Sequence, residues 1–348
     1  MEVEYIVPNG FMNIFCVGEN RPGFDASVVK GLRGLPAERR CYALLMSTVS
    51  VILPTHNRPQ SLVRAASSVL EQSHRELELI VVDDSSAVPA SQALSGLEDE
   101  RMRVLRSDMP LGPARARNLG IEVATGGWIA FQDDDDEWLA GKLERQIAVA
   151  GVAADDVGVV YCSFWTELRD GRRVIGGRRA EQRSGDVHRE LLRGNFIALP
   201  AALVRRAAFD EVGYFDPALP CFEDWDLFIG LAARFRFEHV SEPLLVAHDT
   251  PQSVNKSSSS MRSLALERIL QKHRGAIARD PETHADFLFH IAHYKYLSGD
   301  FRHGRRMFGE SFRMRRSWRT AMTMAATALG PGTYRRLARI YDRSRSNG

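Results

Sequence analysis

The chain has 348 residues, of which 44% are hydrophobic and 26% are charged, and its formal net charge is +2. These values are ordinary for a globular protein of one large or two ordinary domains. No run approaches the roughly 18 consecutive apolar residues that a membrane-spanning helix needs. The four cysteines form no CxxC pair, which argues against a structural zinc site.

The charge is spread unevenly along the sequence. Residues 301–348 contain 12 arginines but only two acids, so this segment carries a formal charge of +10 and the first 300 residues carry −8. A basic segment on an acidic body suggests an anionic partner surface. No nucleic-acid recognition motif accompanies the charge, so we expect no nucleic acid as partner. We expect a cytoplasmic protein that contacts the anionic inner face of the plasma membrane peripherally.

The first 47 residues lack the periodicity of the rest, and Met46 lies just before the first convincing strand. We expect residues 1–47 to be an N-terminal extension that is either loosely ordered or not part of the native chain. From Val49 onward, short apolar runs alternate with amphipathic stretches. The runs predict four strands, over residues 49–53, 77–82, 104–105 and 128–132.

Alternation of this kind is typical of βαβ units and a mostly parallel sheet. Ligands of such sheets bind beyond the carboxyl ends of the strands. Polar residues follow three of the predicted strands, namely Thr55, Asp83–Asp84 and Asp133–Asp136. We therefore expect these segments to meet in a cleft at one edge of the sheet.

The later part of the chain changes character. Residues 157–248 mix predicted strands with helices, and the sequence after Ser257–Ser260 is helical throughout. Residues 292–308 predict a helical hairpin of the tetratricopeptide type, although a single hairpin of this kind is a weak signal. We expect an α/β domain over residues 48–256 and a basic helical C-terminal region over residues 257–348.

Four consecutive aspartates, Asp133–Asp136, are the most informative chemical feature. Adjacent carboxylates repel one another, so a run of them is stable in a solvated turn or, in a cleft, beside a cation. Ligands that are all oxygen suit Mg²⁺ or Mn²⁺. Such an ion usually holds a phosphate-bearing substrate. Taken alone the run predicts a solvated loop, but its neighbours favour the metal site.

Other motifs admit two interpretations each. Asp83–Asp84 can recognise a base or ribose, or only cap a turn. Gly112 opens a helix whose N-terminus attracts phosphate. Arg115 and Arg117 lie about 200° apart on that helix, so both cannot face one ligand. Neither GxGxxG nor GxxxxGK[ST] follows the first strand, which removes the commonest NAD and ATP interpretations.

Two further positions carry candidate chemistry. Asp224 begins a predicted helix between two other acids, Glu223 and Asp226. It is either a helix cap or a general base whose proton affinity is raised by those like charges. His248 follows a predicted strand over residues 244–247 and is a metal ligand, a phosphate contact or a structural residue.

Together, these motifs resemble the family-2 glycosyltransferases with the GT-A fold. The matching segments in order are VILPTHN at 51–57, VVDDSS at 81–86, Gly112 with ARN at 116–118, IAFQDDDDEW at 129–138 and EDWD at 223–226. The resemblance covers about residues 48–250. It implies an α/β, Rossmann-like GT-A fold with a mostly parallel central sheet, followed by a C-terminal helical extension.

The resemblance also implies a role for each matching residue. The expected donor contacts are Thr55, Asn57, Asp83, Asp84, Arg117, Asp133 and Asp134. Asp135 and His248 are expected to bind Mg²⁺ or Mn²⁺, and Asp224 is expected to be the catalytic base. The expected acceptor contacts are Glu223, Arg178 and Arg179. The sequence departs from the family pattern at His56, Gln132 and Asp134, which leaves open which carboxylate touches the metal.

The resemblance predicts a metal-dependent, inverting transfer of a sugar from a nucleotide-diphosphate donor, with UDP as the expected nucleotide. The expected acceptor is a hydroxyl of a glycan or of a lipid-linked molecule, in cell-surface polysaccharide or glycoconjugate synthesis. A nucleotidyltransferase and a catalytically silent nucleotide-sugar-binding module remain as alternatives. A haloacid-dehalogenase phosphatase and a signalling receiver explain fewer of the motifs.

Overall fold

The computed structural model describes residues 2–7, 10–15, 48–176, 183–248, 257–336 and 338. The chain forms two compact units, each built from segments that are separate in sequence. The sheet unit contains residues 1–177, 197–213 and 237–248, and the helical unit contains residues 178–196, 214–236 and 249–348. The sequence-based division at residues 48 and 257 stays a prediction, because the two compact units do not test which segments fold independently.

A nine-stranded sheet is the centre of the sheet unit, with the strand order β5-β4-β3-β6-β10-β8-β11-β7 and β9 paired to β8. Its first four strands run parallel. They are β3 (Val49–Thr55), β4 (Leu77–Asp84), β5 (Met102–Ser107) and β6 (Trp128–Phe131). All four predicted strands are therefore present, and the expected α/β fold class is confirmed.

Beyond β6, strand β10 pairs antiparallel with β6 and β8, β9 pairs antiparallel with β8, and β11 pairs antiparallel with β7. These strands are β7 (Glu137–Trp138), β8 (Val157–Glu167), β9 (Arg173–Gly176), β10 (Ala202–Arg205) and β11 (Arg236–His248). The sheet is thus mixed, with a parallel half that resembles the sequence-based expectation. Antiparallel neighbours need no helical crossover, so the alternating pattern fades in this part of the sequence.

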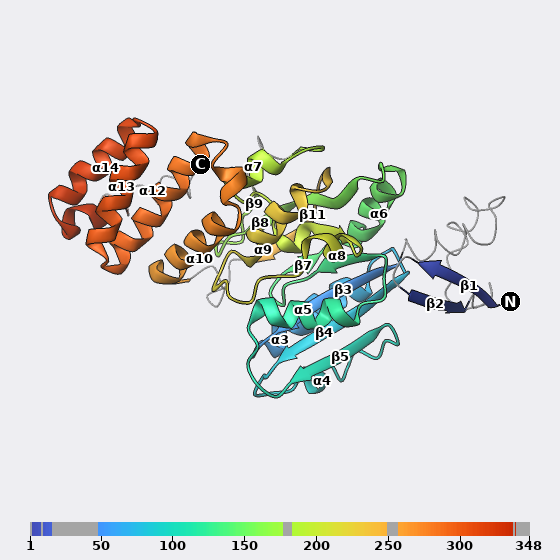
Figure 1. Ribbon diagram of the computed structural model, residues 1–348. Helices are drawn as coiled ribbons and strands as arrows, with labels where there is room; N and C mark the ends of the chain where they lie inside the picture. The colour runs from blue at the N-terminus through green and yellow to red at the C-terminus, as the bar shows by residue number, and fades with distance from the viewer. Residues whose placement is uncertain are drawn as a thin grey trace. The chain divides into compact units, whose positions relative to one another are not determined.

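Strands β3, β4 and β6 are covered on both faces, which explains their largely apolar sequence, whereas β5 lies at the edge of the sheet and is only partly buried. Val51 and Ile52 point to opposite faces of β3, and both are fully buried. The helices of this unit are α3 (Pro59–Leu70), α4 (Ala90–Ala93), α5 (Pro113–Val123), α6 (Lys142–Val152) and α8 (Ala208–Val212), with a short 3₁₀ helix, η1 (Leu199–Ala201). Helix α5 contacts β3 and β4 (Figure 1). The packing fixes where each strand ends, and therefore where the polar loops begin.

A separate two-stranded antiparallel sheet joins β1 (Glu2–Val7) to β2 (Gly10–Phe15) (Figure 1). The rest of the N-terminal extension lies outside the described residues. Whether residues 1–47 belong to the native chain stays a prediction.

The described part of the helical unit contains α7 (His188–Arg193), α9 (Glu223–Ala232), α10 (Ser259–Lys272), α11 (Arg274–Ile277), α12 (Pro281–Ser298), α13 (Phe301–Met314) and α14 (Trp318–Ala328). Helices α12 and α13 form the predicted hairpin (Figure 1). Gly299 ends α12 with a left-handed φ of 101°, and the Asp300 side chain caps α13. Within the described residues, no helix has the length and apolar character needed to span a bilayer.

Gly120 allows α5 to pack closely on β3. A Cβ atom at this position would lie 2.5 Å from Cγ2 of Ile52. We expect Gly120→Ala to lower the free energy of unfolding by about 1–3 kcal/mol, because the buried Ile52 side chain must shift. The change is measured by urea denaturation.

Gly151 in α6 is the matched control, since a Cβ there would meet no atom within 4 Å. Gly151→Ala should stabilise the protein by about 0.5–1 kcal/mol through helix propensity. Equal effects of the two substitutions would contradict the close packing of α5.

Candidate functional site

Three polar loops leave adjacent strands at the same edge of the sheet. Strand β3 pairs in parallel with β4 on one side and β6 on the other. In this register Thr55 pairs with Asp83, and Phe131 at the end of β6 pairs with Ile52. The loops after the three strands therefore begin side by side, and their side chains make the contacts described next.

The loops after β3 and β4 are joined by hydrogen bonds. The Asn57 amide donates to Oγ of Ser86 at 2.9 Å, and the Ala87 amide donates to Oδ1 of Asn57 at 2.7 Å. Asn57 has a φ of 57° and Ser85 a φ of 61°, both in the left-handed region that few side chains adopt. Such strained backbone persists only where surrounding contacts hold it, and it is common at binding sites.

Asp83 organises the loop after β4. Its carboxylate accepts hydrogen bonds from the amides of Ser86 and Ala90, each at 2.9 Å, and pairs with Arg106. Burial alone would raise the pKa of Asp83, but these donors together lower it, so the residue is a stable anion. The side chain is fully buried, and its observed contacts are structural.

Asp84 fixes the entry to helix α5. Its two carboxylate oxygens accept from the backbone amides of Leu111 and Gly112, at 2.5 and 2.9 Å. Gly112 has a φ of 78°, a value that favours glycine, and it directly precedes the helix. Asp84 therefore connects the end of β4 to the N-terminus of α5. The donor contacts expected of Asp83 and Asp84 stay predictions.

Three of the four consecutive aspartates pair with arginines, one just before α3 and one on α5. Arg58 precedes α3 and reaches both Asp134 and Asp135, with Nη1–oxygen distances of 2.7 and 2.8 Å. Nη2 of Arg117 on α5 lies 2.9 Å from Oδ1 of Asp133. As the helix geometry requires, Arg117 is buried while Arg115 is exposed. Arginine supplies the positive charge that lets these carboxylates pack together.

Hydrogen bonds to neutral groups complete this arrangement. Oγ1 of Thr55 donates to Oδ2 of Asp134 at 2.8 Å, which ties the end of β3 to the acid run. Nη2 of Arg64 on α3 donates to the Asp135 carbonyl at 2.8 Å. The Gln132 side-chain amide donates to the carbonyl of Asp136 at 2.9 Å. The acid segment is consequently an ordered part of the sheet unit.

Burial raises the pKa of two of these carboxyls. Asp134 is raised to about 6, chiefly by desolvation, although Arg58 and Thr55 oppose the shift. Desolvation and the charges of Asp133 and Asp135 raise the pKa of Asp136 well above its usual range. Asp133 has the most exposed side chain of the acids that pair with arginine, with 33% of its surface accessible. A second cation near the run would relieve the remaining repulsion.

His248 ends β11 beside the acid segment. Its backbone amide donates to Oδ1 of Asp136 at 3.1 Å. Its ring lies near two glutamates, with Nδ1 3.3 Å from Glu167 and Nε2 3.7 Å from Glu137. The structure therefore places His248 next to the acids, as the sequence predicted, but its role as a metal ligand stays a prediction.

The donor atoms at this edge suit a hard divalent cation. Carboxylate oxygens are the ligands that Mg²⁺ and Mn²⁺ prefer. Across the described residues, no group of three or more His, Cys, Asp or Glu side chains is arranged as a complete metal centre. At phosphate-handling sites Mg²⁺ is commonly held by only one or two carboxylates, with substrate phosphates and water as the other ligands. Asp133 and Asp135 fit that requirement.

Asp224 and Glu223 belong to the helical unit and begin α9. Nδ2 of Asn195 donates to Oδ2 of Asp224 at 3.0 Å, which orients the carboxylate. Phe222, just before the helix, has a left-handed φ of 63°. A strained residue beside a half-buried carboxylate is a feature common at functional sites.

The residues after Asp224 anchor α9 within the helical unit. The Trp225 ring stacks on Phe287 with centroids 5.5 Å apart, and its Nε1 donates to the Leu191 carbonyl. Asp226 is buried and pairs with Lys272 and His273 at 2.5 and 2.8 Å. Within the motif, Asp226 is therefore structural, while Asp224 keeps the more accessible carboxylate. Arg178 and Arg179 lie outside the described residues.

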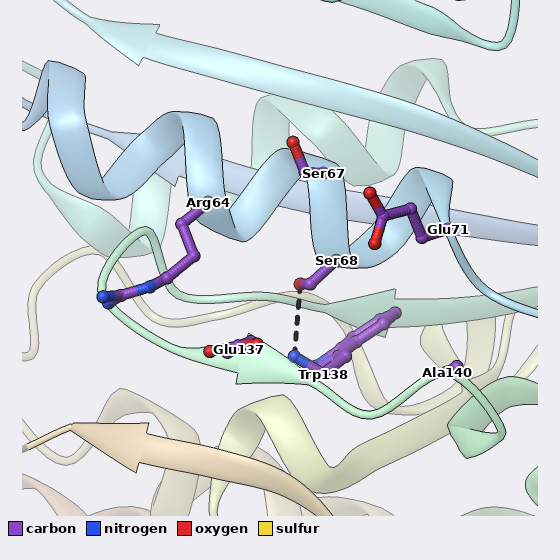
Figure 2. Close-up of a pocket in the computed structure, with 7 residues that line it drawn as sticks. All are labelled: Arg64, Ser67, Ser68, Glu71, Glu137, Trp138 and Ala140. Carbon is purple, nitrogen blue, oxygen red and sulfur yellow. Dashed lines mark hydrogen bonds between the residues drawn. The ribbon is translucent and has the colours of Figure 1, made fainter.

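Figure 2 shows a cavity behind the acid segment, between α3 and β7. It has a volume of about 180 Å³ and is lined by Arg64, Ser67, Ser68, Glu71, Glu137, Trp138 and Ala140. None of the four aspartates lines it. Glu137 lines this cavity from β7, and Ser68 accepts a hydrogen bond from the Trp138 backbone amide at 3.1 Å (Figure 2). The cavity is therefore distinct from the predicted donor site.

Comparison with known proteins identifies the family. Residues 50–213 match the sequence model of glycosyl transferase family 2, a match that includes every sheet-unit motif except His248. These residues form a glycosyltransferase family 2 domain. The family is an inverting one, and further matched relatives are named for succinoglycan and amylovoran biosynthesis.

Individual relatives of the glycosyltransferase domain are moderately similar. The Escherichia coli protein WfgD, named as a UDP-Glc:alpha-D-GlcNAc-diphosphoundecaprenol beta-1,3-glucosyltransferase, is 33% identical over 135 residues. This match covers 39% of the present chain and 52% of WfgD, so the chain spans about half the length of that relative.

Two solved structures show the fold. Residues 1–349 of Staphylococcus aureus TarS, in complex with UDP-GlcNAc, align with a TM-score of 0.60 at 18% identity, covering 85% of this chain and 92% of that one. The Pyrobaculum calidifontis mannosyltransferase PcManGT, in complex with GDP-Man and Mn²⁺, aligns with a TM-score of 0.52 at 18% identity, covering 81% and 79%. The GT-A fold expected from the sequence is therefore confirmed.

Sequence reasoning missed several residues of the glycosyltransferase domain that contact the acids. Arg58 directly follows the first motif, which ends at Asn57. This position beside a motif of the predicted site is the signal that could have identified it. Arg64 and Arg106 stand in no motif, and only the packing of α3 and β5 brings them to Asp135 and Asp83. In the helical unit, nothing in the sequence distinguished Asn195 from other surface amides.

The raised pKa of Asp134 predicts a pH-dependent stability. Because the folded state holds the proton up to about pH 6 and the unfolded state releases it near 3.8, stability falls as pH rises between these values. Relative to Asp134→Asn, we expect the free energy of unfolding of the wild type to fall by at most about 3 kcal/mol from about pH 4 to 7. Urea denaturation across this range measures the difference.

The exposed Asp156 provides the control, because Asp156→Asn should leave the pH profile of stability unchanged. The raised pKa of Asp134 would be contradicted if the free energy of unfolding of the wild type, relative to that of Asp134→Asn, stayed constant or increased as the pH rises.

Proposed function

We propose that this protein is a metal-dependent, inverting glycosyltransferase that uses a nucleotide-diphosphate sugar, with UDP as the nucleotide. The observation that carries the proposal is the ordered acid segment Asp133–Asp136, bound at the carboxyl edge of parallel strands by Thr55, Arg58 and Arg117. TarS in complex with UDP-GlcNAc, and a relative named for a UDP-Glc donor, support the choice of nucleotide.

The proposal gives each side chain a role at the donor. The loops that hold Thr55, Asn57 and Asp84 receive the nucleoside, while Arg117 and the N-terminus of α5 face the diphosphate. Asp133 and Asp135 would hold Mg²⁺ or Mn²⁺, with Asp134 paired to Arg58 and His248 beside them. When bound, the ion neutralises the negative charge that develops on the departing diphosphate. PcManGT in complex with Mn²⁺ supports this assignment.

Asp224 acts as the general base. Its carboxylate takes the proton from an acceptor hydroxyl while that oxygen forms a bond to the anomeric carbon of the sugar. The bond from the anomeric carbon to the diphosphate oxygen breaks on the opposite face, so the configuration inverts and a nucleoside diphosphate departs. Asn195 donates to Oδ2 and the Trp225 backbone amide donates to Oδ1 at 2.8 Å, so that both contacts hold the Asp224 carboxylate in one orientation toward the acceptor.

The acceptor is a hydroxyl of a glycan or lipid-linked molecule, in cell-surface polysaccharide or glycoconjugate synthesis. The diphosphoundecaprenol-linked acceptor in the name of WfgD supports this choice. Glu223 beside the base, together with Arg178 and Arg179, would contact the acceptor. The protein would work at the cytoplasmic face of the plasma membrane, where its basic C-terminal region contacts anionic lipid.

A screen of nucleotide sugars by thermal shift with Mn²⁺ identifies the donor. Analysis of the released nucleotide then separates the alternatives. Release of a nucleoside diphosphate supports glycosyl transfer, whereas release of pyrophosphate shows a nucleotidyltransferase. Donor binding without release on any acceptor shows a silent binding module.

Asp224→Asn should reduce kcat about 10²–10⁴-fold, since an amide cannot accept the acceptor proton, and should leave the dissociation constant of the donor unchanged. Enzyme assay and calorimetry measure the two quantities. Asp226→Asn is the contrasting variant, because it breaks a buried ion pair and should lower the melting temperature. Retention of full activity by Asp224→Asn would exclude this residue as the base.

Removal of divalent metal tests the acid segment. EDTA should abolish transfer, and added Mn²⁺ or Mg²⁺ should restore it. Asp135→Ala should weaken donor binding at least about tenfold and lower kcat/KM about 10²-fold, because the ion loses a ligand. Asp156→Asn serves as the control for a lost surface charge. Full activity after complete metal removal would refute the metal dependence.

A further inference from the structure

Helix α14 presents its large apolar side chains to solvent. Trp318, Met322 and Leu329 have 81%, 64% and 75% of their surface exposed. On a helix of 3.6 residues per turn, these three positions lie within about 40° of one another, so they form a single face. We call these three residues the α14 apolar face.

The side of α14 opposite this face carries Thr320 and Thr327, which are polar yet buried, and the small residue Ala326 is buried on the flank between the two sides. A helix that covers a globular core normally has the reverse arrangement. Packing within the helical unit therefore does not explain why the three residues of the α14 apolar face are exposed. Exposed large apolar side chains that gather on one surface commonly mark an interaction site.

Specific contacts hold α14 in this orientation. The Arg319 guanidinium lies 4.1 Å from the ring centroid of Phe289 on α12. The Thr327 carbonyl accepts hydrogen bonds from Tyr296 and Arg305, at 3.0 and 2.6 Å. These partners lie on α12 and α13 and bind the buried side of α14. The outward direction of the apolar face is therefore built into the helical unit.

Arginines flank an uncharged stretch of the sequence that includes most of α14. Residues 320–334 contain no charged side chain, whereas Arg313 and Arg316 precede α14 and Arg335 and Arg336 follow it. All four arginines are exposed. Positive charge at a helix N-terminus opposes the helix dipole, and α14 has no acid in its first turn to compensate. The arginines that precede α14 therefore do not stabilise α14 through its dipole.

We propose that the α14 apolar face, with Arg313, Arg316, Arg335 and Arg336, docks on the surface of an anionic phospholipid bilayer. Trp318 would lie at the headgroup level, and Met322 and Leu329 would enter the acyl boundary. The arginines would bind lipid phosphates. The inference deepens the proposed function, because a lipid-linked acceptor would reach the enzyme at such a surface.

The charge distribution selects lipid over a second copy of the chain. A two-fold symmetric contact through this face would place its arginines near those of the partner copy, within a segment of formal charge +10. Such a contact is repulsive, whereas an anionic bilayer offers the complementary charge. The combination of tryptophan, aliphatic residues and arginine is also that of interfacial membrane segments.

The test is co-sedimentation of the full chain with vesicles of phosphatidylcholine alone, or with one third phosphatidylglycerol. We expect binding to the anionic vesicles that weakens as salt rises, and little binding to the neutral ones. The variant Trp318→Ser/Met322→Ser/Leu329→Ser should bind at least about tenfold more weakly. The variant Arg313→Gln/Arg316→Gln/Arg335→Gln/Arg336→Gln should bind as weakly and lose the salt dependence.

Val152→Ser is the matched control, since Val152 is an apolar residue of the sheet unit with 88% exposure. It should bind like the wild type. The single variant Trp318→Ser guards against misfolding of the triple variant and should show an intermediate loss. The proposal is overturned if the wild type does not bind anionic vesicles at low salt, or if the triple variant binds as well as the wild type. A wild-type dimer that the triple variant abolishes would assign the face to a second copy instead.

Vesicle binding requires no catalysis, so the experiments can refute the proposed docking surface and the proposed function independently of each other. Binding that is lost in the triple variant, while transfer to a soluble acceptor remains, supports the docking surface. A wild type that binds vesicles through this face but transfers no sugar refutes the proposed enzyme and leaves the docking surface in place.

Discussion

Electrostatic repulsion among Asp133–Asp136 is the constraint on which the rest of the sheet unit depends. Four adjacent carboxylates cannot be packed at the edge of a sheet without positive charge close by. Arg58 and Arg117 supply it, and they come from the residue before α3 and from the first half of α5. The two helices that cover the parallel strands must therefore begin where they do. Helices α3 and α5 must begin at these positions for two reasons. They cover the core of the sheet, and they bring positive charge to the acid segment.

Asp83 and Asp84 fix the backbone that follows the neighbouring strand, β4, in a similar way. Their carboxylates bind backbone amides of the loop after β4 and of the entry to α5. Each polar loop at this edge is thus held by an acid from its own or a neighbouring segment, and the backbone has little freedom to reorganise. A site with fixed dipoles binds and stabilises charge without the cost of reordering at the moment of reaction. The strained φ of Asn57 and Ser85 is consistent with such preorganisation.

The sequence predicted the parallel half of the fold because three of its four strands, β3, β4 and β6, are buried on both faces and read as largely apolar runs. It also placed the acids correctly, because parallel strands bring their carboxyl ends to one edge. In the antiparallel half it located the strand at residues 244–247 but not β7, which has only two residues and gives no periodic signal. Nor could it find Arg64, Arg106 or Asn195, because their contacts depend on tertiary packing between segments far apart in the sequence.

The two units depart from a stability optimum in opposite ways. The sheet unit buries charge, which raises the pKa of Asp134 to about 6. The helical unit exposes apolar surface on α14 while burying small and polar side chains behind it. Neither arrangement is favoured by folding in water alone, since desolvated carboxylates and hydrated tryptophan both cost free energy. The proposed metal ion beside the acids and the proposed lipid surface beside α14 would each offset part of this cost. The deviations from ordinary packing are therefore the parts of this chain where function explains the sequence better than stability does.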